Sequence, residues 1–221
     1  MKLLSIETSG SVCAIALSEN ESILATYSVN GHNMHDRLLA ELTKRILADN
    51  KLSFDDIDAI AVSSGPGSFT GLRIGAAFAK GICFSETPKL ISVPTLSAFA
   101  YAAKEFSALL GNYQICVVVP SHKDLVYYQF FNINAEALSE IFQGTIEELL
   151  KASTGQTFYC GPGAHNLPYG MKNYPYWLLN AEFIAHLGYM YYLEGHFVTA
   201  AEFVPLYIQE FVPKYEVGEF K

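Results

Sequence analysis

Positive charge is scarce in this sequence of 221 residues. Fourteen Lys and Arg stand against 22 Asp and Glu, which gives a formal net charge of −8. A chain with this balance cannot hold a phosphate backbone by itself, because proteins bind nucleic acids largely through clustered cations. If the protein acts on a nucleic acid, another subunit must provide most of the contact.

Long apolar runs and paired cysteines are also missing. No apolar stretch reaches the roughly 20 residues that a membrane-spanning helix needs, and the acidic Glu7 comes too early for a secretory signal. The four cysteines lie far apart and form no C-x-x-C pair, so neither a zinc knuckle nor a redox motif is indicated. We expect a soluble, cytoplasmic protein with buried, reduced thiols and no contact with membranes.

The first half of the sequence alternates strand and helix patterns. Short β-prone runs occupy residues 2–7, 12–17 and 22–29, and a helical pattern follows at 33–49. After it come a buried strand at 57–62, a helix that ends near 84, a strand at 89–93 and a helix at 95–106. This order predicts an α/β domain with a mixed sheet.

The second half opens with the same strand pattern. It predicts strands at 114–119, 125–131 and 157–160, and helices at 145–152 and 180–193. Two halves that open alike indicate a duplicated unit, so we expect an N-terminal lobe at 1–108 and a reduced C-terminal lobe at 109–221. Residues 204–208 predict a last strand, and the tail after it is expected to pack back on the body.

The most informative segment follows the strand at 57–62. It consists of Gly65, Pro66, Gly67, Ser68, Phe69, Thr70 and Gly71, and it predicts a tight turn that leads into a helix. Gly71 and Gly75 would let a neighbouring element pack close to that helix. Free amides at the helix start offer a second interpretation, a phosphate site, but the sequence lacks both the P-loop lysine and a G-x-G-x-x-G fingerprint.

The sequence resembles the bacterial TsaB (YeaZ) family in five segments, which are residues 6–9, 12–17, 65–75, 93–98 and 205–208. That family is the non-catalytic partner of the transferase TsaD in making N6-threonylcarbamoyladenosine at position 37 of tRNAs that read codons beginning with A. The resemblance implies the α/β fold of the actin, sugar-kinase and Hsp70 (ASKHA) type, with mixed sheets and a reduced second lobe. It implies no catalytic residues and no cofactor.

The resemblance also implies that this chain binds no metal. Thr95 and Phe99 stand where TsaD carries two metal-binding histidines, and a phenylalanine has no lone pair to offer a cation. His32 and His35 lie three residues apart without a third ligand nearby, which fits a surface or partner contact better than a metal site. The alternative interpretation is an enzyme of the same fold, which would be a metal- or ATP-dependent transferase, kinase or peptidase-like protein.

Two helices carry more apolar residues than one sheet face can cover. In the TsaB family the corresponding helices pair with TsaD, or with a second copy when TsaD is absent; the ATPase TsaE joins, and tRNA is reached only through the complex. We therefore predict a partner surface formed by Met34, His35, Leu38, Leu42, Ile46, Arg73, Ile74 and Phe78. Residues 120–123 and Gln209 depart from the family pattern, which leaves the role of the second lobe open.

Overall fold

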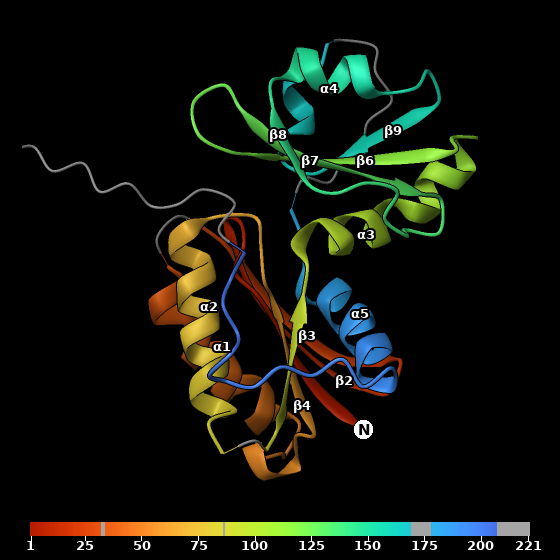
Figure 1. Ribbon diagram of the computed structural model, residues 1–221. Coiled ribbons are helices and arrows are strands. Elements are labelled where there is room, and N and C mark those ends of the chain that lie inside the picture. The colour runs from red at the N-terminus through yellow and green to blue at the C-terminus, as the bar shows by residue number, and fades with distance from the viewer. Residues whose placement is uncertain (32–33, 86, 169–177, 207–221) are drawn as a thin grey trace, which may run out of the picture.

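The computed structural model describes residues 1–31, 34–85, 87–168 and 178–206 (Figure 1). Two β-sheets lie one above the other, and helices α3 (Thr95–Leu109) and α5 (Ala181–Leu193) pack between them. Helices α1 (His35–Asp49) and α2 (Phe69–Ile82) cover the outer face of the first sheet. Helix α4 (Ile146–Ala152) covers the outer face of the second sheet.

The first sheet has the strand order β3-β2-β1-β4-β5. Strands β1 (Lys2–Glu7), β2 (Val12–Glu19) and β3 (Ser22–Asn30) form an antiparallel meander, and β4 (Ala59–Ser63) and β5 (Lys89–Val93) continue it in parallel to β1. Helices cover both faces, so the inner strands β1 and β4 are buried on both sides, polar residues included. The predicted mixed sheet is confirmed.

The second sheet repeats this arrangement with fewer strands, in the order β8-β7-β6-β9. Strands β6 (Gln114–Pro120), β7 (Val126–Asn132) and β8 (Phe142–Gly144) are antiparallel, and β9 (Thr157–Cys160) lies parallel to β6. The expected duplication with a smaller second copy is confirmed, and β8 is a strand that the sequence did not predict. Short 3-10 helices at Phe54–Asp56 and Ala164–Asn166 complete the elements of the described residues.

One apolar core joins the two sheets through α3 and α5. Leu3 and Ala61 contribute from the first sheet, and Val117 and Phe131 contribute from the second. Helix α5 lies so close to the first sheet that a side chain at Gly188 would place its Cβ 2.7 Å from the Cβ of Ala61. No helix within the described residues is long and apolar enough to span a membrane.

The chain after α5 returns to the first lobe. Val198 forms an antiparallel bridge with Leu90 of β5, and Phe203 is 3% exposed in the core beneath α1 and α2. The amide of Leu206 donates a hydrogen bond to Ser64 O at 2.7 Å. The prediction of a strand at 204–208 is wrong for residues 204–206, which belong to no strand. Residues 207 and 208 and the tail predicted to pack on the body lie outside the described residues.

Candidate functional site

The glycine turn connects β4 to α2 at the junction of the two lobes. Gly65 has a φ of +103°, a backbone conformation that favours glycine. Thr95 holds this residue from both sides: its Oγ1 accepts a hydrogen bond from Gly65 N at 3.0 Å, and its N–H donates to Gly65 O at 2.9 Å. The start of α3 therefore fixes the backbone of the turn.

The helix after the turn packs directly against the backbone between β1 and β2. A Cβ at Gly71 would lie 2.1 Å from Thr8 O, and one at Gly67 would lie 2.4 Å from Ser9 O. Ser68 donates its N–H to Ser9 O at 2.7 Å, and its Oγ caps α2 by accepting from Gly71 N at 3.2 Å. The predicted close approach is confirmed, and two amides at the helix start already have protein partners.

Glu7, at the end of β1, is buried beside this turn with an exposure of 1%. Its Oε1 accepts hydrogen bonds from the N–H and the Oγ of Ser9, at 2.6 and 2.5 Å, while its Oε2 has no hydrogen-bond partner among the described residues. Burial raises the pKa of Glu7 from 4.5 to about 7, and the bonds from Ser9 offset only part of this effect. The carboxyl group can therefore carry a proton near neutral pH.

The space around Glu7 is small. The carboxyl group lines a cavity of about 60 Å³ between the lobes, whose wall includes Pro66, Thr95 and Phe99. Cavities that bind small molecules usually measure roughly 300–1,000 Å³, whereas a cavity of this size holds a few water molecules. The arrangement can bury and protonate a carboxyl group, but it does not have room for a nucleotide.

The positions compared with metal-binding histidines have other roles here. Thr95 Oγ1 is engaged with Gly65 N, and Phe99 is buried in the cavity wall. His35 Nε2 lies 3.2 Å from Val12 O, and His32 is outside the described residues. Within the residues that the structure describes, no three His, Cys, Asp or Glu side chains are grouped as metal ligands would be.

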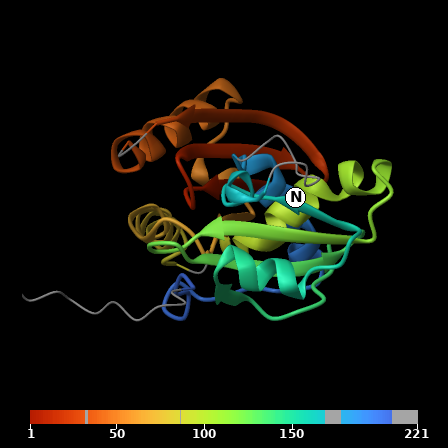
Figure 2. The same cartoon turned by 90° about the horizontal axis from the view of Figure 1, so that it is seen from above.

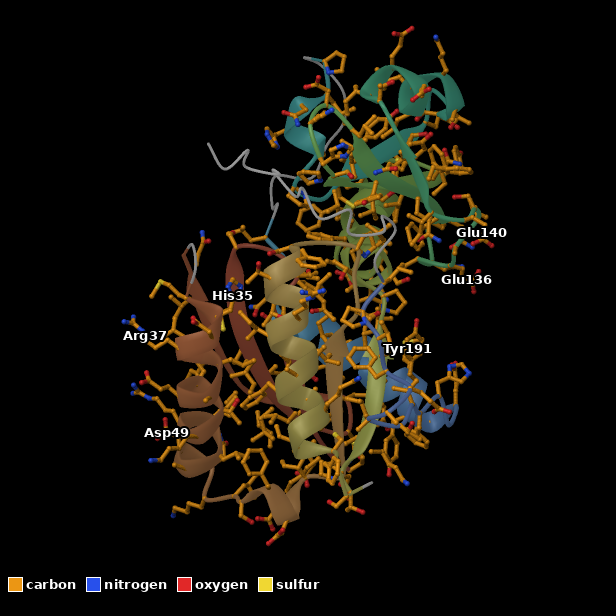
Figure 3. The ribbon with its side chains drawn as sticks, turned by 60° about the vertical axis from the view of Figure 1, so that its left-hand side comes forward. His35, Arg37, Asp49, Glu136, Glu140 and Tyr191 are labelled. Atoms are coloured by element: carbon orange, nitrogen blue, oxygen red, sulfur yellow. The ribbon has the colours of Figure 1, made fainter. Side chains whose placement is uncertain are left out.

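The structure brings most of the predicted partner surface together on the outer side of α1 and α2. Leu38, Leu42, Ile74 and Phe78 are half-buried, pack on the core beneath the helices and keep part of their surface exposed. Arg73 is exposed, and its guanidinium lies 3.8 Å from the ring centroid of Phe69. Figure 3 shows Arg37 and Asp49 on the side of α1 that faces away from α2.

Two predicted surface residues are inside the molecule. Ile46 is 0% exposed and packs in the core, and His35 is 6% exposed with its ring against β2. Helical periodicity identifies the apolar side of α1, but it does not divide that side between its own sheet and a partner. Ile46 therefore adds no contact area, whereas His35 reaches the surface only as part of the wall of a hollow at the start of the two helices. Met34 is partly exposed.

A polar hollow of about 270 Å³ lies where the starts of α1 and α2 meet the β1–β2 turn. Ser11, Asp36, Thr70 and Ile74 are among its lining residues. A larger and mostly apolar cavity, of about 520 Å³, lies on the other face of the first sheet between β3, α3 and α5. Neither hollow was predicted, because each is lined by segments far apart in the sequence.

Known proteins match this chain over most of its length. The family model described as "TsaD: tRNA N6-adenosine threonylcarbamoyltransferase" matches residues 29–190. The tRNA threonylcarbamoyladenosine biosynthesis protein TsaB of Haemophilus influenzae is 27% identical over 223 residues, covering 95% of this chain and 94% of that protein. The tRNA N6-adenosine threonylcarbamoyltransferase of Thermosipho melanesiensis is 28% identical over 145 residues, which are 58% of this chain but 45% of the transferase.

A solved structure, YeaZ from Pseudomonas aeruginosa, superposes on this fold with a TM-score of 0.81. The two chains are 22% identical, and the superposition covers 94% of this chain and 99% of that one. Identity at this level speaks for the fold alone. Together with the family-model match and the sheet order that recurs in the two lobes, it confirms the expected duplicated α/β fold with mixed sheets and a reduced second lobe.

Proposed function

Because the chain belongs to the TsaB (YeaZ) branch of the TsaD family, we propose that it is a non-catalytic binding subunit that docks and activates a TsaD-type transferase. The chain is a protein of tRNA threonylcarbamoyladenosine biosynthesis, and so of tRNA modification. We propose that the subunit binds the transferase through a folded surface and so favours the active conformation of the transferase. We propose that the protein acts in the cytoplasm.

The observation that carries the proposal is the surface of α1 and α2. Leu38, Leu42, Ile74 and Phe78 rest on the core with one side and expose the other. Partly exposed apolar side chains beside an exposed charged residue, here Arg73, match the composition expected of a protein interface. The polar hollow at the start of the two helices adds a recess that a partner side chain could enter.

The chemistry of the glycine turn supports a role without catalysis. The turn is tied to Thr95 and to the β1–β2 turn by hydrogen bonds within the chain. The cavity at Glu7 is too small for a nucleotide. Phe99 supplies no ligand atom at the position where the transferase family uses a histidine.

The remaining partners follow from the same proposal. With a net charge of −8, the chain would meet tRNA only through the transferase. An ATPase of the TsaE type would join the assembled pair, and in the absence of the transferase the α1–α2 surface would pair with a second copy of this chain.

Sedimentation velocity of this chain, alone and mixed with the TsaD-type transferase of the same organism, tests the proposal. We expect a homodimer of the chain alone and a heterodimer in the mixture. Arg73→Glu and Ile74→Asp should each weaken the heterodimer by about tenfold or more. The first reverses a charge in the proposed interface, and the second introduces a charge where the native residue is apolar.

Leu109→Asp is the matched control, because Leu109 is an apolar residue with 83% exposure at the far end of α3. It should leave the heterodimer unchanged. Circular dichroism of all three variants checks that they are folded; Arg73 is exposed, so its substitution leaves the core intact. Equal binding by Arg73→Glu, Ile74→Asp and the unmodified chain would place the interface elsewhere, and no complex in any mixture would remove the proposal.

A further inference from the structure

The outer edge of the first sheet is open along β3 (Figure 2). Within the described residues, no strand pairs with β3 on the side away from β2. This strand is nine residues long and contains neither a charged residue nor a proline. An edge of this kind presents unpaired backbone N–H and C=O groups and can serve as a template for a further strand.

The other sheet edges of the described structure are protected. Strand β5 carries Lys89, and its neighbour Leu90 is paired with Val198 of the C-terminal segment. The edges of the second sheet, β8 and β9, are only three and four residues long. Charge, cover and short length are the usual means of blocking unwanted strand pairing. Within the described residues the edge of β3 has none of these three, and its one irregularity lies opposite Leu17 and Ser18.

Most of the β3 edge is regular and held in place. The pairing with β2 is irregular only near Leu17 and Ser18, and it runs without interruption from Ala25 to Asn30. On the face toward α1, the hydroxyl of Tyr27 donates a hydrogen bond to Asp49 at 2.6 Å. Residues 25–30 therefore form a regularly paired edge that needs little ordering before a second strand can pair with it.

A cavity of about 520 Å³ opens at the Asn30 end of this edge. Ser28 and Asn30 line it from β3, and three phenylalanines from α3 and α5 form much of its wall. Among the described lining residues, Glu182 is the one that carries a charge. The lining residues are Val12, Ser28, Asn30, Phe99, Ala102, Phe106, Leu178, Leu179, Asn180, Glu182 and Phe183. An apolar recess of this size accepts one or two large side chains.

We propose that residues 25–30 and this cavity bind an extended segment of a second protein as an additional strand of the first sheet. Backbone hydrogen bonds hold the segment, and a large apolar side chain enters the cavity, because every second side chain of a strand faces the same side of the sheet. A lysine or arginine of the segment lies beside Glu182. An acidic segment is disfavoured, because the described wall offers a carboxylate and no cation.

This surface is separate from the one proposed for the transferase. The cavity lies on the face of the first sheet that α5 covers, and α1 and α2 lie on the opposite face. Both surfaces can therefore be occupied at the same time. The proposal does not depend on the identity of the transferase partner.

The full chain is titrated into a fluorescent synthetic peptide that alternates threonine and valine and ends in phenylalanine and lysine. We expect an anisotropy change with a Kd below about 1 mM. Replacing the phenylalanine by serine or the lysine by glutamate should each weaken binding by about tenfold. Two peptides N-methylated on alternate residues, one for each edge of the peptide strand, test the backbone pairing: one should lose binding and the other should keep it.

Variants of the protein test the cavity. Phe106→Ser should weaken binding of the unmodified peptide by about tenfold, since Phe106 is 43% exposed at the cavity rim. Leu109→Ser, on the same helix but outside the cavity, should leave binding unchanged. Glu182→Gln should bind the lysine and glutamate peptides equally.

Three results would overturn the proposal. The first is no anisotropy change up to millimolar protein, and the second is binding that neither N-methylated peptide alters. The third is self-association of the chain that Phe106→Ser abolishes, because the surface would then belong to a second copy. Ile74→Asp should bind the peptide normally, so failure here and failure of the transferase interface can be told apart.

Discussion

Replacing Glu7 by glutamine should change how the stability of the fold depends on pH. The pKa of Glu7 is raised by burial from 4.5 to about 7, so between these values the folded state holds a proton that the unfolded state has released. The contribution of Glu7 to the free energy of unfolding is therefore highest when the pH is below the pKa of the unfolded state. It is lost as the pH rises through the pKa of the folded state. A shift of this size corresponds to roughly 3 kcal/mol.

Glutamine has nearly the same shape and keeps an oxygen that can accept the two hydrogen bonds from Ser9. Below the unfolded pKa, where the native carboxyl is protonated, Glu7→Gln and the unmodified chain should be about equally stable. Near pH 8 the variant should be more stable by up to roughly 3 kcal/mol, which corresponds to a Tm that is about 6–12 °C higher for a chain of this length.

The measurement is urea unfolding of both proteins at several values of pH from acidic to mildly alkaline. Subtracting the two curves removes every group that the chains share and leaves the contribution of Glu7. Glu41→Gln is the control, because Glu41 is exposed on α1 and its carboxylate is solvated in both states. A difference between Glu7→Gln and the unmodified chain that stays constant with pH would refute the assignment of a buried, protonated carboxyl group.

Three further outcomes follow from the same region and from the buried thiols. Gly71→Ala should destabilise the fold by about 1–3 kcal/mol in chemical unfolding, because the new Cβ would lie 2.1 Å from Thr8 O; Gly81→Ala, in the same helix with nothing within 4 Å, should be neutral or stabilising. Thr95→Val should cost about 1–3 kcal/mol in the same assay because Gly65 N–H loses its acceptor, and Thr95→Ser should recover most of it. Burial raises the pKa of Cys13 to about 11 and that of Cys83 to about 12, so both thiols should react with Ellman's reagent only after denaturant is added; rapid reaction of the native protein would contradict their burial.

Much of the first lobe was predictable because its local signals agree with its final structure. The strand at Lys2–Glu7 and the strand at Lys89–Val93 have the bounds that the sequence predicts. The spacing of Gly71 and Gly75 indicates a close approach to the helix, and the structure supplies the partner, the backbone and side chain of Thr8. Glycine is informative here because the contact needs the absence of a side chain.

The functional features that depend on distant segments were not predictable. The raised pKa of Glu7 follows from its burial in the folded chain, and the hydroxyl of Thr95 accepts a hydrogen bond from a residue thirty positions earlier in the chain. The burial of Ile46 depends on how α1 is rotated over its sheet. The cavity beside β3 needs two helices from different halves to meet. Each of these is a property of the packing between elements.

The return of the chain to the first lobe has a consequence for protein synthesis. All strands of the first sheet have been synthesised once the chain reaches Val93. Helix α5, which covers the inner face of this sheet, is complete only at Leu193. A ribosome that adds about 5–20 residues per second needs roughly 5–20 s to make the residues between them. During that interval Leu3 and Ala61 have no helix over them, so a nascent chain released before α5 has been made would expose an apolar sheet and should aggregate.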